Sequence, residues 1–222
     1  MYLNFELKNI AELKEVLINH PALKGFNVTI PYKESVIPFM DELSDEAKAI
    51  GAVNCVKILE DRNRATVFSG KRFVGYNTDV FGFASSIKPF LEPQHERALI
   101  LGTGGSSKAV AFALKRIGVE VYYASSSKKA DNAFTYEQLN EHMIRAFKLI
   151  VNTTPLGMYP KTEEAPEIPY EFIGAQHLCY DLIYNPEETM FLKKCKTQGA
   201  VVINGYNMLK LQAEKSWEIW NS

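Results

Sequence analysis

The residues whose spacing indicates chemistry most directly are the glycines between Ala98 and Ala109, in the run Ala-Leu-Ile-Leu-Gly-Thr-Gly-Gly-Ser-Ser-Lys-Ala. An apolar segment that ends in glycines and continues as a helix is typical of a strand, a tight turn and a helix N-terminus. The first amides of a helix have no intrahelical acceptor, so they bind anions such as a pyrophosphate. Gly102 is expected in the turn, Gly104 beside the ligand, and Gly105 where helix and strand approach. A plain strand-turn-helix gives the same pattern, so other segments must decide.

A second segment whose residue types could do chemistry is Asn-Val-Thr-Ile-Pro-Tyr-Lys, from Asn27 to Lys33. Its alternation predicts a strand over 26–33 that Pro31 ends. The polar members are Asn27, Thr29 and Lys33. A strand that carries an amide, a hydroxyl and an ammonium group either shows them to solvent or contributes them to a site. Both interpretations stay open on the residues alone.

Two more polar residues, Asn54 and Asp79, stand out beside predicted elements. Asn54 lies in a strand expected at 52–59, and Asp79 ends a strand expected at 72–79. A helix is expected to follow at 80–91, and an aspartate at a strand-to-helix junction is a common N-cap. A capping role and a functional role for Asp79 can coexist.

Two groups of elements must position these residues. Before residue 81, strands mix with short helices that have clear starts at Asn9 and Ser44 and a stop at Gly51. After it, strand and helix alternate as in a parallel, doubly wound sheet with right-handed connections. Strands are expected at 1–6, 26–33, 52–59, 72–79, 98–101, 119–123, 148–152, 177–182 and 200–203. Helices are expected after Asn9, at 34–40, 44–51, 80–91, 106–117 and 135–147, from a cap at 185–188, and at 206–220.

The sequence therefore predicts an α/β fold with two domains. Residues 1–80 with 206–222 form the smaller α/β domain, and residues 81–205 form a Rossmann-like dinucleotide-binding domain. The terminal helix has Leu209, Ala213 and Trp217 at helical spacing, so we expect it to pack against the first domain.

Composition excludes several classes of function. A chain of 222 residues with a formal net charge of -1 has no charge surplus to hold nucleic acid or an anionic membrane, so a small-molecule ligand is favoured. Three separated cysteines indicate neither a disulfide framework nor a zinc site, and we expect reduced structural thiols and no metal. No apolar stretch is long enough to span a bilayer and no secretory signal is present, so we expect a cytoplasmic protein.

The segment after the second strand of the alternating run bears on the choice of cofactor. NAD-binding folds place a carboxylate there for the ribose 2'-hydroxyl. Here the run is Ala-Ser-Ser-Ser-Lys-Lys, in which Ser126, Lys128 and Lys129 could face an extra phosphate, which favours NADP. A solvated loop explains the same residues. Asn152 to Met158 adds polar side chains at the carboxyl edge of the third strand, where doubly wound sheets bind ligands.

Together these motifs resemble those of the shikimate dehydrogenase family, over nearly the whole chain and in the family's order. The resemblance implies NADP-linked interconversion of 3-dehydroshikimate and shikimate, a step of aromatic amino-acid biosynthesis through chorismate. The segments that carry it are Asn27 to Lys33, Gly51-Ala-Val-Asn54, Gly75-Tyr-Asn-Thr-Asp79, Gly102 to Ala109, Asn152 to Met158, Tyr180-Asp-Leu-Ile-Tyr184, and Gly205 to Leu209 with Gln212.

The resemblance also implies roles for individual residues. Lys33 and Asp79 match the central polar pair of the active site, and Thr29, Asn54, Tyr184 and Gln212 match residues that line the substrate pocket. Hydride transfer to a ketone builds negative charge on oxygen, which a nearby ammonium group such as that of Lys33 can stabilise and protonate. The candidate cofactor-binding residues are Gly102, Thr103, Gly104, Gly105, Ser106, Ser126, Lys128, Lys129, Asn152, Thr153, Met158 and Gly205.

Two departures from the family pattern leave alternatives open. The family's Asn-Arg-Thr after the second Rossmann strand is here Ala-Ser-Ser, which puts the cofactor choice in doubt. The family's opening strand, helix and Ser-x-Ser segment have no counterpart before Met1, so we expect a truncated member whose first domain is incomplete. The alternatives are a quinate/shikimate dehydrogenase that also uses NAD, and a non-catalytic nucleotide-binding module. A monomer or homodimer is expected.

Overall fold

The computed structural model describes residues 2–61, 70–126 and 132–222. The chain divides into two compact units, one of Met1–Thr78 with Glu214–Ser222 and one of Asp79–Ala213. The sequence predicts limits at 80/81 and 205/206; the first differs by two residues, and the second by eight, so residues 206–213 fall in the second unit. No helix in the described ranges is long and apolar enough to cross a membrane. The three cysteines, Cys55, Cys179 and Cys195, are buried free thiols.

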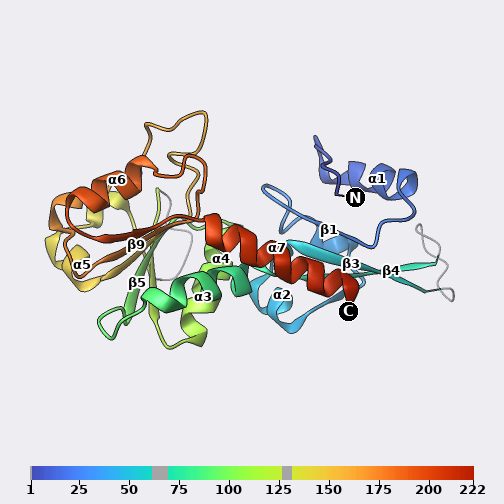
Figure 1. The fold of residues 1–222 in the computed structure, drawn as a ribbon, viewed down its shortest axis with the longest axis horizontal. Helices are drawn as coiled ribbons and strands as arrows, with labels where there is room; N and C mark the ends of the chain where they lie inside the picture. Colours follow the sequence, from blue (N-terminus) through green and yellow to red (C-terminus); the bar gives the residue numbers. More distant parts are fainter. Residues whose placement is uncertain (1, 62–69, 127–131) are drawn as a thin grey trace. The chain divides into compact units, whose positions relative to one another are not determined.

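The first unit contains a mixed four-stranded sheet in the order β1-β3-β4-β2 (Figure 1). Its strands are β1 (Gly25–Asn27), β2 (Glu42–Leu43), β3 (Cys55–Glu60) and β4 (Lys71–Tyr76). β3 pairs antiparallel with β1 and β4, and β2 pairs parallel with β4. The unit's apolar core lies between this sheet and the helical segments, with Val36, Val53 and Val56 among its buried residues.

The short helices of the first unit begin and end where the sequence predicts. The Asn9 side chain accepts a hydrogen bond from the Ala11 amide and starts the 3-10 helix η1 (Ile10–Glu12), which continues as α1 (Leu13–Asn19). Ser44 caps α2 (Asp45–Ile50) by accepting from the Ala47 amide, and Gly51 ends it at φ 70°. Side-chain oxygens satisfy the first amides of a helix, and glycine adopts the left-handed conformation that ends one.

Three expectations for the first unit are wrong. The opening residues 2–6 form no strand, because alternation alone supplies no pairing partner, and Tyr2 instead reaches Asn27 Oδ1 through its hydroxyl. The strand expected at 26–33 ends at Asn27, since the Tyr32 amide bonds the Thr29 carbonyl and closes a turn. The helix expected at 34–40 is only the 3-10 helix η2 (Ile37–Phe39).

The second unit contains a six-stranded, all-parallel sheet in the order β10-β9-β8-β5-β6-β7. A parallel sheet formed by alternating strands and helices confirms the predicted doubly wound class. The order reverses between β5 and β8, because strands later in the chain lie on opposite sides of β5. The strands are β5 (Arg97–Leu101), β6 (Glu120–Ala124), β7 (Ala133–Phe134), β8 (Leu149–Asn152), β9 (Leu178–Asp181) and β10 (Val201–Ile203).

Helices cover both faces of this sheet (Figure 1). On one face, Phe83 of α3 packs edge-on against Tyr180 of β9, and α4 lies beside α3. On the other, Ile144 of α5 and Phe191 of α6 join Leu99 and other strand residues in the larger apolar core. The helices are α3 (Asp79–Ile87), α4 (Gly105–Arg116), α5 (Glu141–Ala146), α6 (Met190–Thr197) and α7 (Tyr206–Asn221), with 3-10 helices η3 (Lys88–Phe90), η4 (Tyr136–Gln138) and η5 (Tyr170–Phe172).

Several boundaries in the second unit differ from expectation. The helix expected at 135–147 is divided into η4 and α5, because Thr135 and Gln138 close a capping box and Asn140 then caps α5. The cap of the sixth helix is Thr189 and not residues 185–188, since the Thr189 side chain accepts from the Leu192 amide. The short strand β7 is not foreseen in the sequence.

Candidate functional site

The glycine loop has the geometry expected of a dinucleotide-binding turn. Gly102 adopts φ 99°, where side chains are strained, and a Cβ there would lie 3.0 Å from Thr153 Oγ1. A Cβ at Gly104 would meet nothing within 4 Å, so the backbone is open to a ligand at that point. α4 begins at the next residue, and Gly104 has no side chain to cap it. Thr103 lies between these two glycines, and Ser106 lies in the first turn of α4.

Two other segments, the end of β6 and the loop after β8, meet the glycine turn where the strand order reverses. The Gly102 amide donates to the Ala124 carbonyl at the end of β6 (2.8 Å). The Thr153 amide and hydroxyl both donate to the Leu101 carbonyl, at 3.0 and 2.7 Å, and so fasten the loop after β8 to the end of β5. Doubly wound sheets bind ligands at such a switch point, outside the carboxyl ends of the strands.

The end of β6 contributes an exposed hydroxyl from Ser126. Its neighbour Ser125 is buried, and the Ser125 amide donates to the Phe134 carbonyl of β7 (3.0 Å). The two candidate phosphate-binding residues that follow, Lys128 and Lys129, lie outside the described residues. The described part of this loop therefore contains one of the three side chains expected to meet a 2'-phosphate.

Asn152, expected to bind the cofactor, has a fully buried side chain that is occupied within the fold. Its Oδ1 accepts from the Thr154 amide (3.0 Å) and hydroxyl (2.7 Å), and its Nδ2 donates to Asp181 Oδ1 (3.1 Å). Asp181 also accepts from the Ile183 amide (3.0 Å) and the Thr189 hydroxyl (2.6 Å). Asn152 therefore connects the loop after β8, through Thr154, to the buried Asp181 carboxylate.

Burial raises the pKa of the Asp181 carboxyl to about 6, although the hydrogen bonds from Thr189, Ile183 and Asn152 act in the opposite direction. Sequence reasoning missed this residue, which is only one member of the Tyr180 to Tyr184 motif. The signal that could have found Asp181 is the strand register, which pairs it with Asn152 at the carboxyl ends of two neighbouring parallel strands.

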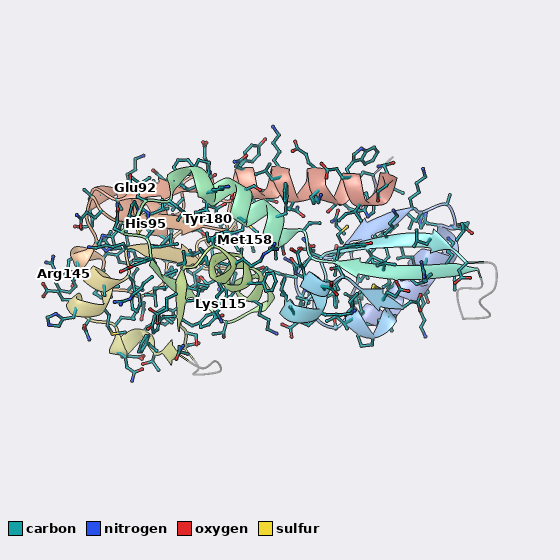
Figure 2. The ribbon with its side chains drawn as sticks, turned by 90° about the horizontal axis from the view of Figure 1, so that it is seen from below. Glu92, His95, Lys115, Arg145, Met158 and Tyr180 are labelled. Atoms are coloured by element: carbon teal, nitrogen blue, oxygen red, sulfur yellow. The ribbon has the colours of Figure 1, made fainter. Side chains whose placement is uncertain are left out.

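Three other predicted residues lie around the same edge of the sheet. Met158, labelled in Figure 2, has a side chain that is 47% exposed. Tyr184 follows β9 and is also exposed. Gly205 is buried, and a Cβ there would lie 2.0 Å from the Leu182 carbonyl oxygen, so only glycine fits against that backbone.

In the first unit, Asn54 is buried and bound to the end of β4. Its Oδ1 accepts from the Thr78 amide at 2.7 Å, and its Nδ2 donates to Thr78 Oγ1 at 3.1 Å. Thr78 Oγ1 lies 3.1 Å from Ser216 Oγ on α7, which also accepts from Asn27 Nδ2 at 2.9 Å. Asn54 thus fixes the residue that precedes Asp79. The buried Ser216, which sequence reasoning missed, could be found only by knowing which helix face meets the sheet.

Lys33 and Thr29 lie in the irregular segment that follows β1. Lys33 is half-buried, and its carbonyl accepts from the Val53 amide at 2.7 Å. Thr29 is exposed. The segment is fixed at its start by the Val28 amide, which donates to the Asn54 carbonyl at 2.8 Å. The turn therefore brings Thr29 and Lys33 to the end of β3 at which Asn54 lies.

Asp79 and Gln212 belong to the second unit. α3 begins at Asp79 itself, so this residue stands inside the helix and is not the N-cap that the sequence suggests. Its side chain is buried. A Cβ on Gly82 would lie 2.9 Å from Gln212 Cβ and 2.7 Å from the Met208 carbonyl, so the first turns of α3 and α7 pack backbone to backbone. Gln212 consequently lies beside the helix that Asp79 begins.

The fold and the switch-point loops define a two-unit α/β protein with a dinucleotide-binding unit. A sequence model of the family described as "Shikimate dehydrogenase substrate binding domain" matches residues 1–56. The shikimate dehydrogenase (NADP(+)) of Methanococcus aeolicus is 39% identical over 235 residues, which cover 99% of this chain and 81% of the relative. The chain therefore belongs to the shikimate dehydrogenase family.

Solved structures agree with this assignment. The shikimate dehydrogenase of Aquifex aeolicus superposes with a TM-score of 0.80 at 36% identity, over 96% of this chain and 78% of that one. The Thermus thermophilus enzyme, solved with NADP(H) and shikimate, superposes with a TM-score of 0.79 at 30% identity, over 96% and 79% of the two chains. The resemblance drawn from the sequence is confirmed at the level of family and fold.

Proposed function

We propose that this chain is an NADP-linked oxidoreductase that reversibly reduces the ketone of 3-dehydroshikimate to the CH-OH group of shikimate. The observation that carries the proposal is the switch-point edge of the parallel sheet, where the glycine turn, open at Gly104, meets the Thr153 loop in a chain of this family. The same chemistry places the chain in aromatic amino-acid biosynthesis. Small-molecule ligands, a monomeric or homodimeric state and a cytoplasmic location accompany this proposal as predictions.

The residues at the switch point fit a dinucleotide. Gly104 leaves open space before α4, a helix of 12 residues whose N-terminal amides favour a pyrophosphate. We expect Gly102 to Ser106 to hold that group and Ser126 with Lys128 and Lys129 to meet a 2'-phosphate. Thr153, Met158 and Gly205 are the further proposed cofactor-binding residues. When bound, the reduced cofactor NADPH would supply the hydride for ketone reduction, and NADP+ would accept it in the reverse direction. The buried Asn152 acts through the loop that it supports.

The chain's own residues supply the rest of the chemistry. We propose that the Lys33 ammonium stabilises the negative charge that develops on the substrate oxygen and gives it a proton during reduction. Asp79 is the second member of this pair and orients the reacting hydroxyl. Thr29, Asn54, Tyr184 and Gln212 are the proposed substrate-binding residues.

A steady-state assay with shikimate and quinate, each with NADP and NAD, tests the activity. We expect turnover of shikimate with NADP and tighter binding of NADP than of NAD, by a margin that added salt weakens because it screens the attraction between lysine and phosphate charges. Equal turnover of quinate with NAD would favour the quinate/shikimate alternative. Nucleotide binding without turnover of either substrate would favour a non-catalytic module.

Lys33→Ala tests the proposed catalytic pair. We expect kcat to fall by about two to four orders of magnitude with little change in NADP affinity, as for the loss of a positioned general acid or base. Lys24→Ala is the matched control, because Lys24 is an exposed lysine near the same strand. Asp79→Asn removes the charge and keeps an oxygen acceptor. Retained turnover in Lys33→Ala would overturn the catalytic assignment of Lys33. If Asp79→Asn loses stability but keeps full activity, the role of Asp79 is to stabilise the start of its helix and not to act in catalysis.

A further inference from the structure

Asp181 is a buried carboxylate to which the proposed mechanism gives no role, yet three separate segments converge on it. It lies at the end of β9 and is completely buried. Its oxygens accept hydrogen bonds from Asn152 Nδ2 on β8, from the Ile183 amide in the following loop, and from the Thr189 hydroxyl at the start of α6. A buried carboxylate is costly unless it is hydrogen-bonded, so this arrangement requires all three donors.

Two of these partners, Asn152 and Ile183, pass the constraint outward to loops at the proposed ligand-binding edge, whereas Thr189 ties the carboxylate to the start of α6. Asn152 Oδ1 holds the amide and hydroxyl of Thr154, and Thr154 Oγ1 accepts from the Leu156 amide (3.3 Å). This path leads into the loop that ends at Met158. Ile183 directly precedes Tyr184, and its carbonyl accepts from the Gly205 amide (3.0 Å). One carboxylate therefore connects loops that carry proposed cofactor-binding and substrate-binding residues.

We propose that Asp181 is a positioning residue that holds the loops 153–158 and 182–189 in the relative arrangement needed to bind NADP and substrate together. The inference rests on the proposed function, because it deepens the account of the same site. Asp181 touches neither ligand and acts only through Asn152, Ile183 and Thr189. A misplacement of about 1 Å, even from a change far from the chemistry, lowers reactivity by about a hundredfold, which gives such a residue a measurable effect.

The electrostatic surroundings make the role testable by pH. The titratable side chains that interact with Asp181 are Tyr180 on its own strand, Tyr170 of η5 and Cys195 of α6. Burial raises the pKa of Tyr180 to about 12, and burial with nearby groups raises the pKa values of Tyr170 and Cys195 as well. All three stay neutral at neutral pH, whereas the pKa of Asp181 is about 6. Within this cluster, only Asp181 changes charge between about pH 5 and 8.

Asp181→Asn is the central variant, because asparagine keeps the shape and one acceptor oxygen but cannot accept all three donors or titrate. We expect the NADP Kd, measured by calorimetry, and the KM for shikimate both to rise about ten- to a hundredfold. Ser86→Ala is the matched control. Ser86 of α3 is also buried; its hydroxyl lies 2.7 Å from the hydroxyl of Tyr180, the residue next to Asp181, and donates to the Phe83 carbonyl of its own helix. It should lose stability and keep both constants within about twofold.

Two further measurements separate positioning from simple stability. The wild-type profile of kcat/KM should fall as pH drops through about 6, and Asp181→Asn should lack that limb. Thr154→Val breaks the path at its next step and should raise the NADP Kd alone. Combined with Asp181→Asn, it should add little to the effect on NADP, because both act through Asn152.

The outcomes distinguish this inference from the proposed function. If the wild type turns over shikimate, but Asp181→Asn changes only the melting temperature and leaves both constants and the pH limb intact, the positioning role is overturned. Should Asp181→Asn fail to fold, an unchanged NADP Kd in Thr154→Val overturns the role on its own. Absence of shikimate turnover in the wild type would contradict the proposed function, and the calorimetric NADP Kd of the variants would still decide the cofactor half of the inference.

Discussion

Each unit of the molecule contains a buried polar network beside the residues proposed to bind ligands, and the two networks differ in charge. In the first unit, amide and hydroxyl groups of Asn27, Asn54, Thr78 and Ser216 bond one another. In the second unit, the donors converge on the carboxylate of Asp181. Both networks tie the end of one strand to a helix, so the same mechanical task is performed with and without an ionised group.

The difference in charge decides how each network responds to the loss of a member and to a change of pH. Groups in the neutral network both donate and accept, so losing one member leaves the others with partners. The carboxylate only accepts, and its burial is unfavourable in the charged form, so it depends on its donors and on pH. Tyr2 and Cys55 are ionisable groups bonded to members of the first network; burial raises the pKa of both, that of Cys55 to about 11, so both stay neutral at neutral pH.

The sharpest test of the comparison is Asp181→Leu, a change of similar size that removes the acceptor for three buried donors. Each stranded donor costs about 1 to 3 kcal/mol, so we expect the free energy of unfolding at pH 7 to fall by about 3 to 5 kcal/mol. Urea denaturation measures it, provided that the slope with denaturant stays constant. A loss below about 1 kcal/mol would mean that the donors find other partners and that the two networks are equivalent.

A second prediction concerns pH. Because the pKa of Asp181 is raised in the folded state from 3.8 to about 6, the native protein holds this proton more tightly than the unfolded chain does. The contribution of Asp181 to stability is therefore largest below about pH 4, falls as pH rises and is fully lost above about 6. Asp181→Asn removes this dependence. Relative to the wild type, its free energy of unfolding should gain roughly 3 kcal/mol between about pH 4 and pH 7.

The measurement is a series of urea denaturations of the wild type and Asp181→Asn across that pH range. Comparing variant with wild type at each pH cancels the titration of all other carboxyl groups. A difference in free energy of unfolding that stays constant with pH would show that the Asp181 carboxyl titrates alike in the folded and unfolded chains. The charged network would then lose its distinguishing property.

Local signals in the sequence predict the glycine turn, the helix caps and the parallel sheet better than they predict the two buried networks. The glycine turn is predicted because the positive φ at residue 102 favours glycine, so the residue type itself indicates the turn. The cap at Ser44 and the stop at Gly51 are predicted for the same reason, since each is decided within four residues. The parallel sheet follows from alternation of strands and helices, which needs no knowledge of partners.

The networks themselves escape prediction because they depend on register between distant segments. Asn152 lies at the carboxyl end of its strand, as predicted, but sequence does not show that its side chain points inward to Asp181. Pro186 draws the predicted cap to 185–188, whereas Thr189 takes that place and also donates to the buried carboxylate. Ser216 looks like one more polar residue of an amphipathic helix until the face of α7 that meets β1 is known.

The smallest expected effect is that of Ser216→Ala, which tests whether the neutral network tolerates loss of its central hydroxyl. Asn27 Nδ2 keeps its bond to the Asn54 carbonyl (3.1 Å), and Thr78 Oγ1 keeps Asn54 as a partner, so neither group is left without a hydrogen bond. The free energy of unfolding should therefore fall by only about 1 to 2 kcal/mol, mostly from the lost bonds of a fully buried side chain.

The same urea denaturations at pH 5 and 7 measure this loss, with Ser35→Ala on the exposed surface as the control. Because no group in this network changes charge over that range, the difference from the wild type should be equal at both values. A loss as large as that of Asp181→Leu, or one that varies with pH, would show that the first unit depends on its network as strongly as the second does.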